Sequence, residues 1–213
     1  MVTNKNILIT AGSTWVAIDK VRIISNTASG KTGLLLAKQL KKSGAKITLL
    51  LGPGDFSNSR IPGIRVVNFK YFRELKKLLS SELKKQKYSA LIHAAAVADY
   101  RPEKAFNRKI SSSLSNWKIS LVPTEKLING VKRIAPGLVL VGFKFEPDAG
   151  KNRLFEKGRQ LLKEADLDIV VANACRNKTY QAYILDKTNG YGPFLNKFKM
   201  AAYLSKILKD RLR

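Results

Sequence analysis

Short apolar runs alternate with amphipathic segments along most of the chain. Residues 7–10 are rich in β-branched side chains and stop at the small residues 11–14, so they predict a buried strand that ends in a tight loop. In the segment 30–43, leucines recur at the spacing of one helix face, and Gly44 is typical of a helix end. The pattern predicts a strand, a loop to about Ala28 and then a helix.

The same alternation continues towards the end of the chain. The further strands that we expect are 45–51, 64–68, 90–96, 138–143 and 168–172, and the further helices are 71–86, 152–165 and 197–211. Strands separated by helices predict a Rossmann-like, doubly wound α/β fold, in which a mostly parallel sheet carries helices on both faces. The sequence contains no repeat and no low-complexity linker, so residues 1–213 are expected to form a single domain.

Two segments break the alternation. Residues 101–122 contain a proline, several basic residues and a cluster of serines, which predicts a flap or a projecting arm. Residues 180–195 begin with an alternating stretch and contain the turn sequence Asn189-Gly190, which predicts a C-terminal hairpin.

The chain carries an unusually large positive charge. Its 40 lysines and arginines against 15 acidic residues give a formal net charge of +25, which points to anionic partners. Many lysines, however, stand among leucines at helical spacing, as they do on solvated helix faces. No Cys/His finger and no basic region followed by heptads accompanies the charge. Nucleic acid is therefore an open but less favoured partner.

Several classes of protein are excluded by what the sequence lacks. No apolar run approaches the roughly 20 residues that cross a bilayer. The first residues lack the order of a signal peptide, so a cytoplasmic protein without membrane attachment is expected. One cysteine, Cys175, and one histidine, His93, argue against a disulfide framework and a histidine-based metal site. We expect His93 to pack on its strand and Cys175 to lie half-buried in a loop, and neither to be catalytic.

Two glycine-containing stretches look like nucleotide-binding motifs but lack essential parts. Gly30-Lys31-Thr32 resembles the end of a P-loop, yet the glycine required five positions earlier is Ser25, and no strand directly precedes the loop. The loop after residues 7–10 lacks the spaced glycines of a dinucleotide-binding turn. A P-loop nucleotide-binding protein and a nicotinamide-dependent oxidoreductase are therefore disfavoured.

Two small-residue loops and one acid nevertheless form a candidate phosphate site. The loops 12–14 and 27–30 lie at a strand end and a helix start, where backbone N–H groups can approach phosphate oxygens. Asp99 follows the strand 90–96, at the sheet edge where such folds bind ligands. This carboxylate could bind a ribose hydroxyl, a metal ion that carries phosphates, or the amides of a turn.

Four blocks of sequence, in order, resemble phosphopantothenate-cysteine ligase, an enzyme of coenzyme A biosynthesis. The blocks are 9–14, 18–33, 94–102 and 141–146, and weaker similarity continues through 167–173 and 193–201. The resemblance implies that a phosphopantothenate carboxylate attacks the α-phosphate of a nucleoside triphosphate and that cysteine then displaces the nucleotide. CTP is the expected co-substrate, with ATP as the alternative, and Mg²⁺ is the expected cation. Such chemistry depends on positioning and on cations, and needs no histidine or cysteine nucleophile.

The resemblance also implies roles for single residues. Asn26 corresponds to the residue that holds the acyl intermediate in the second step, and Lys109 to the flap lysine that covers the triphosphate in the first. Asp99 corresponds to the acid beside the nucleotide or its metal ion. The remaining nucleotide-binding candidates are Gly12, Ser13, Thr14, Ser29, Gly30, Phe143 and Lys144, and the substrate-binding candidates are Asn26, Ala95 and Ala96.

The chain also departs from the family pattern. After Lys109 it reads Ile110-Ser111-Ser112, so two flap lysines are lost, and its first loop lacks the usual glutamate and proline. The resemblance implies a homodimer and, since many bacterial members are fused to a decarboxylase that this chain is too short to contain, a separate decarboxylase as a partner. The alternative is an inactive, basic nucleotide- or nucleic-acid-binding protein, because ligase chemistry does not explain a charge of +25.

Overall fold

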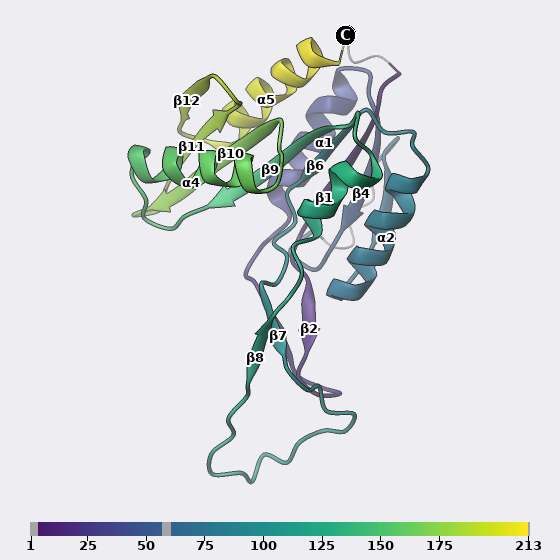
Figure 1. Ribbon diagram of the computed structural model, residues 1–213, viewed down its shortest axis with the longest axis vertical. Helices are drawn as coiled ribbons and strands as arrows, with labels where there is room; N and C mark the ends of the chain where they lie inside the picture. Colours follow the sequence, from purple (N-terminus) through teal and green to yellow (C-terminus); the bar gives the residue numbers. More distant parts are fainter. Residues whose placement is uncertain (1–3, 57–60, 213) are drawn as a thin grey trace.

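An eight-stranded sheet forms the centre of the computed structural model, which describes residues 4–56 and 61–212 (Figure 1). The strand order is β12-β11-β10-β9-β6-β1-β4-β5. From β10 to β5 neighbouring strands run parallel, whereas β11 and β12 are antiparallel. The strands are β1 (Asn6–Ala11), β4 (Lys46–Leu51), β5 (Arg65–Asn68), β6 (Ala90–His93), β9 (Val139–Phe145), β10 (Ile169–Arg176), β11 (Thr179–Leu185) and β12 (Gly190–Phe194). The predicted sheet and C-terminal hairpin are confirmed.

Helices cover both faces of this sheet, as the sequence predicts. On one face α1 (Lys31–Lys42) and α5 (Lys197–Arg211) pack on a buried apolar cluster. On the other face α2 (Phe72–Lys84), the short α3 (Val131–Ile134) and α4 (Lys151–Glu164) pack on a second cluster. Successive side chains of a strand point to opposite faces, so Ile7 and Ile9 join the first cluster and Leu8 joins the second. A strand that is buried on both faces needs the continuous apolar run that we observe in β1.

Local polar groups fix the ends of the helices. Gly44, with φ +90°, follows α1 and permits the left-handed turn that ends it. The Asn196 side chain accepts a hydrogen bond of 2.8 Å from the Lys199 amide and so caps α5. Strand β10 extends to Arg176, and Cys175 is an exposed residue on it. The expectation of a half-buried loop cysteine is therefore wrong, because the strand continues into its hairpin with β11.

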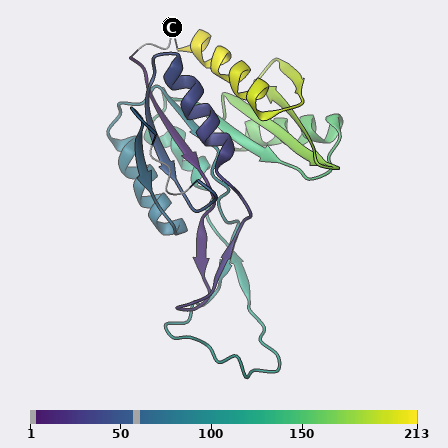
Figure 2. The same ribbon diagram turned by 180° about the vertical axis from the view of Figure 1, so that it is seen from behind.

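Two short hairpins form an arm that projects from the carboxyl edge of the sheet (Figures 1 and 2). One consists of β2 (Trp15–Ala17) and β3 (Ile23–Ser25), and the other of β7 (Tyr100–Pro102) and β8 (Leu121–Pro123). The expected arm at residues 101–122 is confirmed, whereas the single loop expected up to Ala28 is wrong because it contains the first hairpin. Strands of three residues are too short for their alternation to be recognised in the sequence.

The segment between β8 and β9 contains two short helical elements. A 3₁₀ turn, η1 (Leu127–Gly130), leads directly into α3, in a stretch that is not among the helices expected from the sequence. Across residues 4–56 and 61–212, none of the helices combines the length and apolarity needed to span a membrane.

Close contact between α1 and β1 requires a glycine at position 33, and its replacement is expected to destabilise the fold. A Cβ atom on Gly33 would lie 2.4 Å from the Ala11 Cβ, so Gly33→Val should lower the free energy of unfolding by roughly 3 kcal/mol or more. Urea denaturation measures this effect. Gly137→Ala is the control, because a Cβ there meets no described atom within 4 Å. Equal midpoints for Gly33→Val and wild type would contradict this packing.

Candidate active site

The loop after β1 is held tightly against two neighbouring loops. Gly12 has φ +82°, and a Cβ on it would lie 2.6 Å from the Gly52 carbonyl oxygen, so only glycine fits here. The Ser13 amide donates to the Pro53 carbonyl at 3.0 Å, and the Ala96 amide donates to the Gly12 carbonyl at 2.8 Å. These bonds place the loop 12–14 beside the loop 94–97 that follows β6.

Asn26 joins the same group of loops from the base of the arm. Its side-chain amide donates to the Val97 carbonyl at 3.1 Å. The neighbouring Ser25 hydroxyl lies 3.1 Å from the Ser13 hydroxyl and donates to the Thr14 carbonyl at 3.2 Å. No described residue donates a hydrogen bond to the side-chain oxygen of Asn26, so this amide can still interact with a ligand.

Ser29 and Gly30 form the opening of α1 next to this loop cluster. Gly30 has φ +79°, and a Cβ on it would lie 3.5 Å from the Gly12 amide nitrogen. The Ser29 hydroxyl accepts a hydrogen bond of 3.3 Å from the Lys31 amide. The first amides of a helix lack intrahelical acceptors and carry partial positive charge. The structure thus brings Gly12 and Gly30 together, whereas a phosphate site formed by Gly12, Ser29 and Gly30 stays a prediction.

A buried polar pair lies beneath the loop that carries Ala95 and Ala96. The Thr10 hydroxyl lies 2.9 Å from His93 Nδ1 and accepts a hydrogen bond of 3.3 Å from the Ala95 amide. His93 is buried, as predicted, and burial lowers its pKa to about 4. The neutral imidazole therefore helps to fix the loop by holding Thr10.

The buried imidazole makes stability dependent on pH. Because the folded protein holds His93 neutral, its contribution is fully present above the ordinary pKa of 6.5 and is lost as the pH falls towards about 4. Urea midpoints measured through this range should show a loss of about 3 kcal/mol, since each pKa unit corresponds to about 1.4 kcal/mol. His93→Gln should flatten the dependence on pH, and an unchanged slope in that variant would assign the effect to other groups.

Asp99 lies at the same sheet edge but is exposed and already paired. Its carboxylate forms an ion pair with Lys126, and the two side chains are 58% and 61% exposed. Within the described part of the chain, no three histidine, cysteine or acidic side chains gather as a metal site. A single carboxylate still suits Mg²⁺, which is commonly held by one or two carboxylates together with substrate phosphates. Asp99 can thus serve as one ligand of a phosphate-bound cation if Lys126 turns away.

Phe143 and Lys144 occupy successive positions on β9 and therefore point to opposite faces of the sheet. Phe143 is half-buried against the cluster beneath α1 and α5. Lys144 forms an ion pair of 2.9 Å with Glu146, and this lysine lowers the pKa of the glutamate. The sequence predicts both residues at the nucleotide, but their side chains lie on opposite faces of the sheet.

The start of α4 supplies cations that the sequence reasoning missed. Arg153 and Lys157 both act electrostatically on Glu146, beside Lys144. The two residues are four apart and thus share one helix face, and α4 follows β9 at the carboxyl edge of the sheet. Their spacing was visible in the sequence, but it resembles that of any solvated helix face. The fold shows that this face lies near Glu146, at the end of β9.

Lys109 lies on the outer part of the arm, away from the loops that surround Asn26. The next residue, Ile110, donates its amide to Asp19 Oδ2 at 3.1 Å, and its carbonyl accepts from Arg22 at 3.0 Å. Asp19 and Arg22 form the turn of the β2–β3 hairpin, at the end opposite Ser25. Within one chain, the structure does not bring Lys109 and Asn26 together.

Asp19 is the acceptor that joins the two halves of the arm. Its buried carboxylate also accepts from the Val21 and Arg22 amides and pairs with the Arg22 guanidinium at 2.6 Å. Although burial raises its pKa, these hydrogen bonds outweigh that effect and lower the pKa to about 2. The charged form of Asp19 is therefore the form that holds the arm.

Replacing Asp19 by asparagine is expected to release the outer arm. An amide has one acceptor oxygen in place of two and no charge for Arg22, so the bond to Ile110 should weaken. Limited proteolysis should cut within residues 103–120 about tenfold faster than in wild type, since a tenfold ratio corresponds to about 1.4 kcal/mol. Asp148→Asn is the control, on an exposed acid outside the arm. Equal cleavage rates for Asp19→Asn and wild type would show that Asp19 does not hold the arm.

Comparison with known proteins shows similarity over almost the whole chain. The model of a family described as the DNA/pantothenate metabolism flavoprotein C-terminal domain matches residues 2–208. The chain is 35% identical over 174 residues, 81% of its length, to the coenzyme A biosynthesis bifunctional protein CoaBC of Thermococcus kodakarensis, of which it covers 42%. It is 33% identical to CoaBC of Borreliella burgdorferi, over 96% of the chain and 52% of that protein. The chain thus spans about half the length of these relatives.

The fold is shared with a solved structure as well. The DNA/pantothenate metabolism flavoprotein of Streptococcus pneumoniae superposes with a TM-score of 0.86 at 24% identity. The match covers 97% of this chain and 99% of that one. The sheet, the helices on both faces and the arm therefore belong to one shared architecture.

Proposed function

This chain belongs to the DNA/pantothenate metabolism flavoprotein C-terminal domain family, and from that premise we propose that it is a phosphopantothenate-cysteine ligase of coenzyme A biosynthesis. The observation that carries the proposal is the meeting of three loops at the carboxyl edge of the sheet. These are the loops of Gly12, of Asn26 to Gly30, and of Ala95 and Ala96. Together they offer an anionic substrate the amide side chain of Asn26 and the free N–H groups at the start of α1.

The first step activates the carboxylate. A carboxylate oxygen of phosphopantothenate attacks the α-phosphorus of the nucleotide, the new O–P bond forms, and the bond to pyrophosphate breaks. The opening of α1 at Ser29 and Gly30 provides N–H groups for the phosphates, and Arg153, Lys157 and Lys109 provide the positive charge that this transfer needs. We propose CTP as the nucleotide, with ATP as the alternative that an assay separates.

The second step makes the amide. The amine of cysteine attacks the acyl carbonyl, a C–N bond forms, the nucleoside monophosphate leaves with the bonding electron pair, and the amine loses a proton. Asn26 is the residue that we propose to orient the acyl group, because its side-chain nitrogen is held by the Val97 carbonyl. Ala95 and Ala96, on the neighbouring loop, are the further substrate-binding residues of the proposal.

A divalent cation completes the proposal. Asp99 is the residue that would hold Mg²⁺, and the ion would neutralise phosphate charge during the first step. Lys126 forms an ion pair with Asp99 and is free to move to a phosphate when the cation arrives, because both side chains are more than half exposed.

The position of the arm favours a homodimer in which Lys109 serves the partner's site. The outer part of the arm lies away from Asn26 of the same chain, and the hydrogen bond between Ile110 and Asp19 holds it there. In a dimer with two-fold symmetry, each subunit would place its arm over the loops of the other subunit. Since the relatives are bifunctional and the chain spans about half their length, we further propose that a decarboxylase acts on the product.

Pyrophosphate release tests the proposal. Protein, Mg²⁺ and phosphopantothenate are mixed with CTP or with ATP, with and without cysteine, and pyrophosphate and the cysteine amide are quantified. We expect release with one nucleotide and amide only when cysteine is present. If folded protein releases pyrophosphate with neither nucleotide, the ligase proposal fails. Strong, salt-sensitive binding to duplex DNA in that case would support the basic nucleic-acid-binding alternative.

A further inference from the structure

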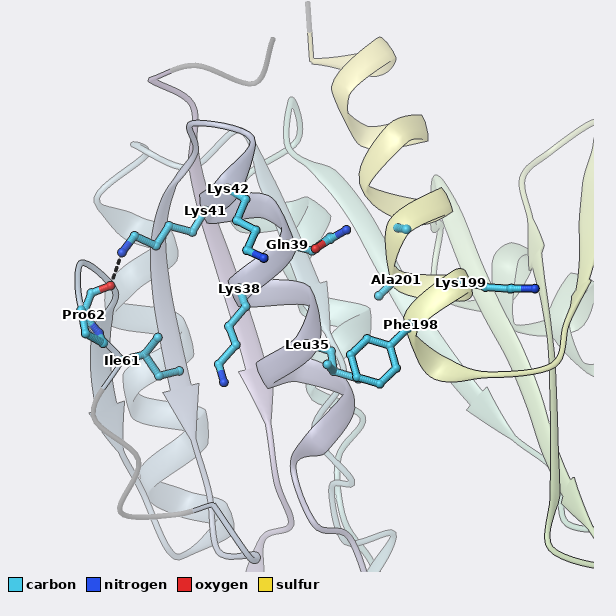
Figure 3. Close-up of a pocket in the computed structure, with 11 residues that line it drawn as sticks. Leu35, Lys38, Gln39, Lys41, Lys42, Ile61, Pro62, Phe198, Lys199 and Ala201 are labelled. Atoms are coloured by element: carbon cyan, nitrogen blue, oxygen red, sulfur yellow. Dashed lines mark hydrogen bonds between the residues drawn. The ribbon is translucent and has the colours of Figure 1, made fainter.

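A groove lies between α1, α5 and the loop at Ile61 and Pro62, apart from the loops of the candidate active site (Figure 3). Its volume is about 740 Å³. Leu35 and Ala201 form part of its floor, and the ring of Phe198 stands beside Leu35. A smaller cavity of about 370 Å³ shares Leu35 and Ile61 and continues the groove along α1.

The groove leaves a large aromatic side chain without cover. Phe198 is 66% exposed in the first turn of α5, although the helix buries Met200, Leu204 and Leu208 on its other side. An exposed aromatic that walls a concave apolar surface is typical of a ligand site, in contrast to single apolar residues scattered over a convex surface.

Lysines surround this apolar floor without acidic partners. Lys38 and Lys42 stand one turn apart on α1, and Lys199 extends from α5 (Figure 3). None of the three forms an ion pair with an acidic residue in the described part of the chain, and no acidic residue is among those that line the groove. Lys41 differs, because it donates to the Pro62 carbonyl. The groove therefore complements a ligand with an apolar body and a negative head.

We propose that this groove binds a single-chain amphiphilic anion, an alkyl chain with a carboxylate head. The volume lies in the range of about 300–1,000 Å³ that small-molecule sites occupy. A second copy of the chain is a poor occupant, because in a two-fold contact at this groove the lysines of one copy would face the same lysines of the other. The concave shape favours an inserted chain over a flat membrane surface. The alkyl chain would lie against Phe198 and Leu35, and the carboxylate would lie between Lys38 and Lys42.

Titration calorimetry with decanoate, below its micelle concentration, tests the proposal. Saturable binding at one site per chain is expected, weaker at high salt because the head group is charged. Decanol and acetate should each bind at least about tenfold more weakly, because each lacks one half of the ligand. Equal binding of decanol would overturn the anion site, and no saturable binding of decanoate would overturn the proposal altogether.

Variants locate the binding. Phe198→Ser and the pair Lys38→Gln with Lys42→Gln should each weaken decanoate binding about tenfold or more. The control removes two exposed lysines of α2, Lys77→Gln with Lys84→Gln, and should leave the affinity unchanged. Thermal melting checks that each variant is folded, and Phe198 is exposed enough for its replacement to be tolerated. Decanoate affinity that is the same in all folded variants would place the ligand elsewhere.

Other occupants give distinct results. A Phe198→Ser variant that changes the sedimenting mass of the protein would show that a second copy covers the groove. Binding to vesicles of anionic lipid that is lost in the same variant, without binding of free decanoate, would show a membrane contact. An acidic amphipathic peptide that saturates the groove where decanoate does not would show a protein partner. Each of these results would overturn the small-molecule proposal.

Discussion

Replacing Lys109 by glutamine is expected to lower the rate of pyrophosphate release about 100-fold or more, the usual cost of removing one preorganised donor to a developing charge. The substitution leaves an uncharged, polar side chain one bond shorter than lysine and removes the ammonium group. Its neighbour Ile110 keeps its bonds to Asp19 and Arg22, so the arm should stay in place. Release is measured with saturating nucleotide and phosphopantothenate, without cysteine.

The matched control for this experiment is Lys104→Gln, which removes an equal charge from an exposed position on the same arm. It should change the rate of release by less than about threefold, as a surface charge contributes little. If both variants lose activity equally, the arm acts through its overall charge and Lys109 has no particular role. If neither does, Lys109 does not take part in the first step.

Replacing Asn26 by aspartate is expected to separate the two steps. Aspartate has no N–H to donate to the Val97 carbonyl, and its charge would face both that carbonyl and the acyl phosphate. Pyrophosphate release should stay within about tenfold of wild type, while amide formation falls about 100-fold or more. Rapid quenching and chromatography would then show acyl-nucleotide accumulating with cysteine present.

A second variant protects this test against a purely structural effect. Ser25→Ala removes a hydroxyl that bonds to Ser13 and Thr14 in the same loop, without touching Asn26. If Asn26→Asp and Ser25→Ala impair both steps to the same degree, loop geometry explains the loss. Loss of amide formation in Asn26→Asp alone assigns the second step to this side chain.

The two variants together also decide which subunit supplies Lys109. If the arm serves the partner's site, a mixed dimer of the two variants has one site with both defects and one site with none. Random exchange of subunits should then restore about one quarter of wild-type activity, since half of the dimers are mixed. If the arm serves its own chain, every site keeps one defect and mixing restores nothing.

Much of the fold could be predicted from the sequence because its main elements carry their own patterns. The continuous apolar runs of β1 and β4 reflect burial on both faces, and Gly44 marks the end of α1. The hairpin β2–β3 could not be predicted, since its exposed and half-buried residues follow no simple period. Its register depends on Asp19 and on the distant Ile110.

The two loop glycines could be recognised because backbone geometry demands that residue type. Gly12 and Gly30 both adopt positive φ, and both stand in small-residue loops that the sequence marks as candidates for binding phosphate. The cations of α4 were not predictable, because Arg153 and Lys157 differ from other surface residues only by the strand that α4 follows. The pairing of Lys144 with Glu146 likewise depends on the sheet and not on a motif.

The carboxylate of Asp19 gives the arm a mechanical property. It fastens the segment after Lys109 to the turn of the β2–β3 hairpin, and β3 runs from that turn directly to Ser25 and Asn26. A movement of the outer end of the hairpin would therefore also move the loop that holds Asn26. In the proposed dimer, each arm would place Lys109 over the partner's triphosphate, while the base of the same arm holds Asn26 in its own site. Opening one arm to release pyrophosphate from the partner's site would therefore also move Asn26 of its own chain, so that the two sites of the dimer would be coupled.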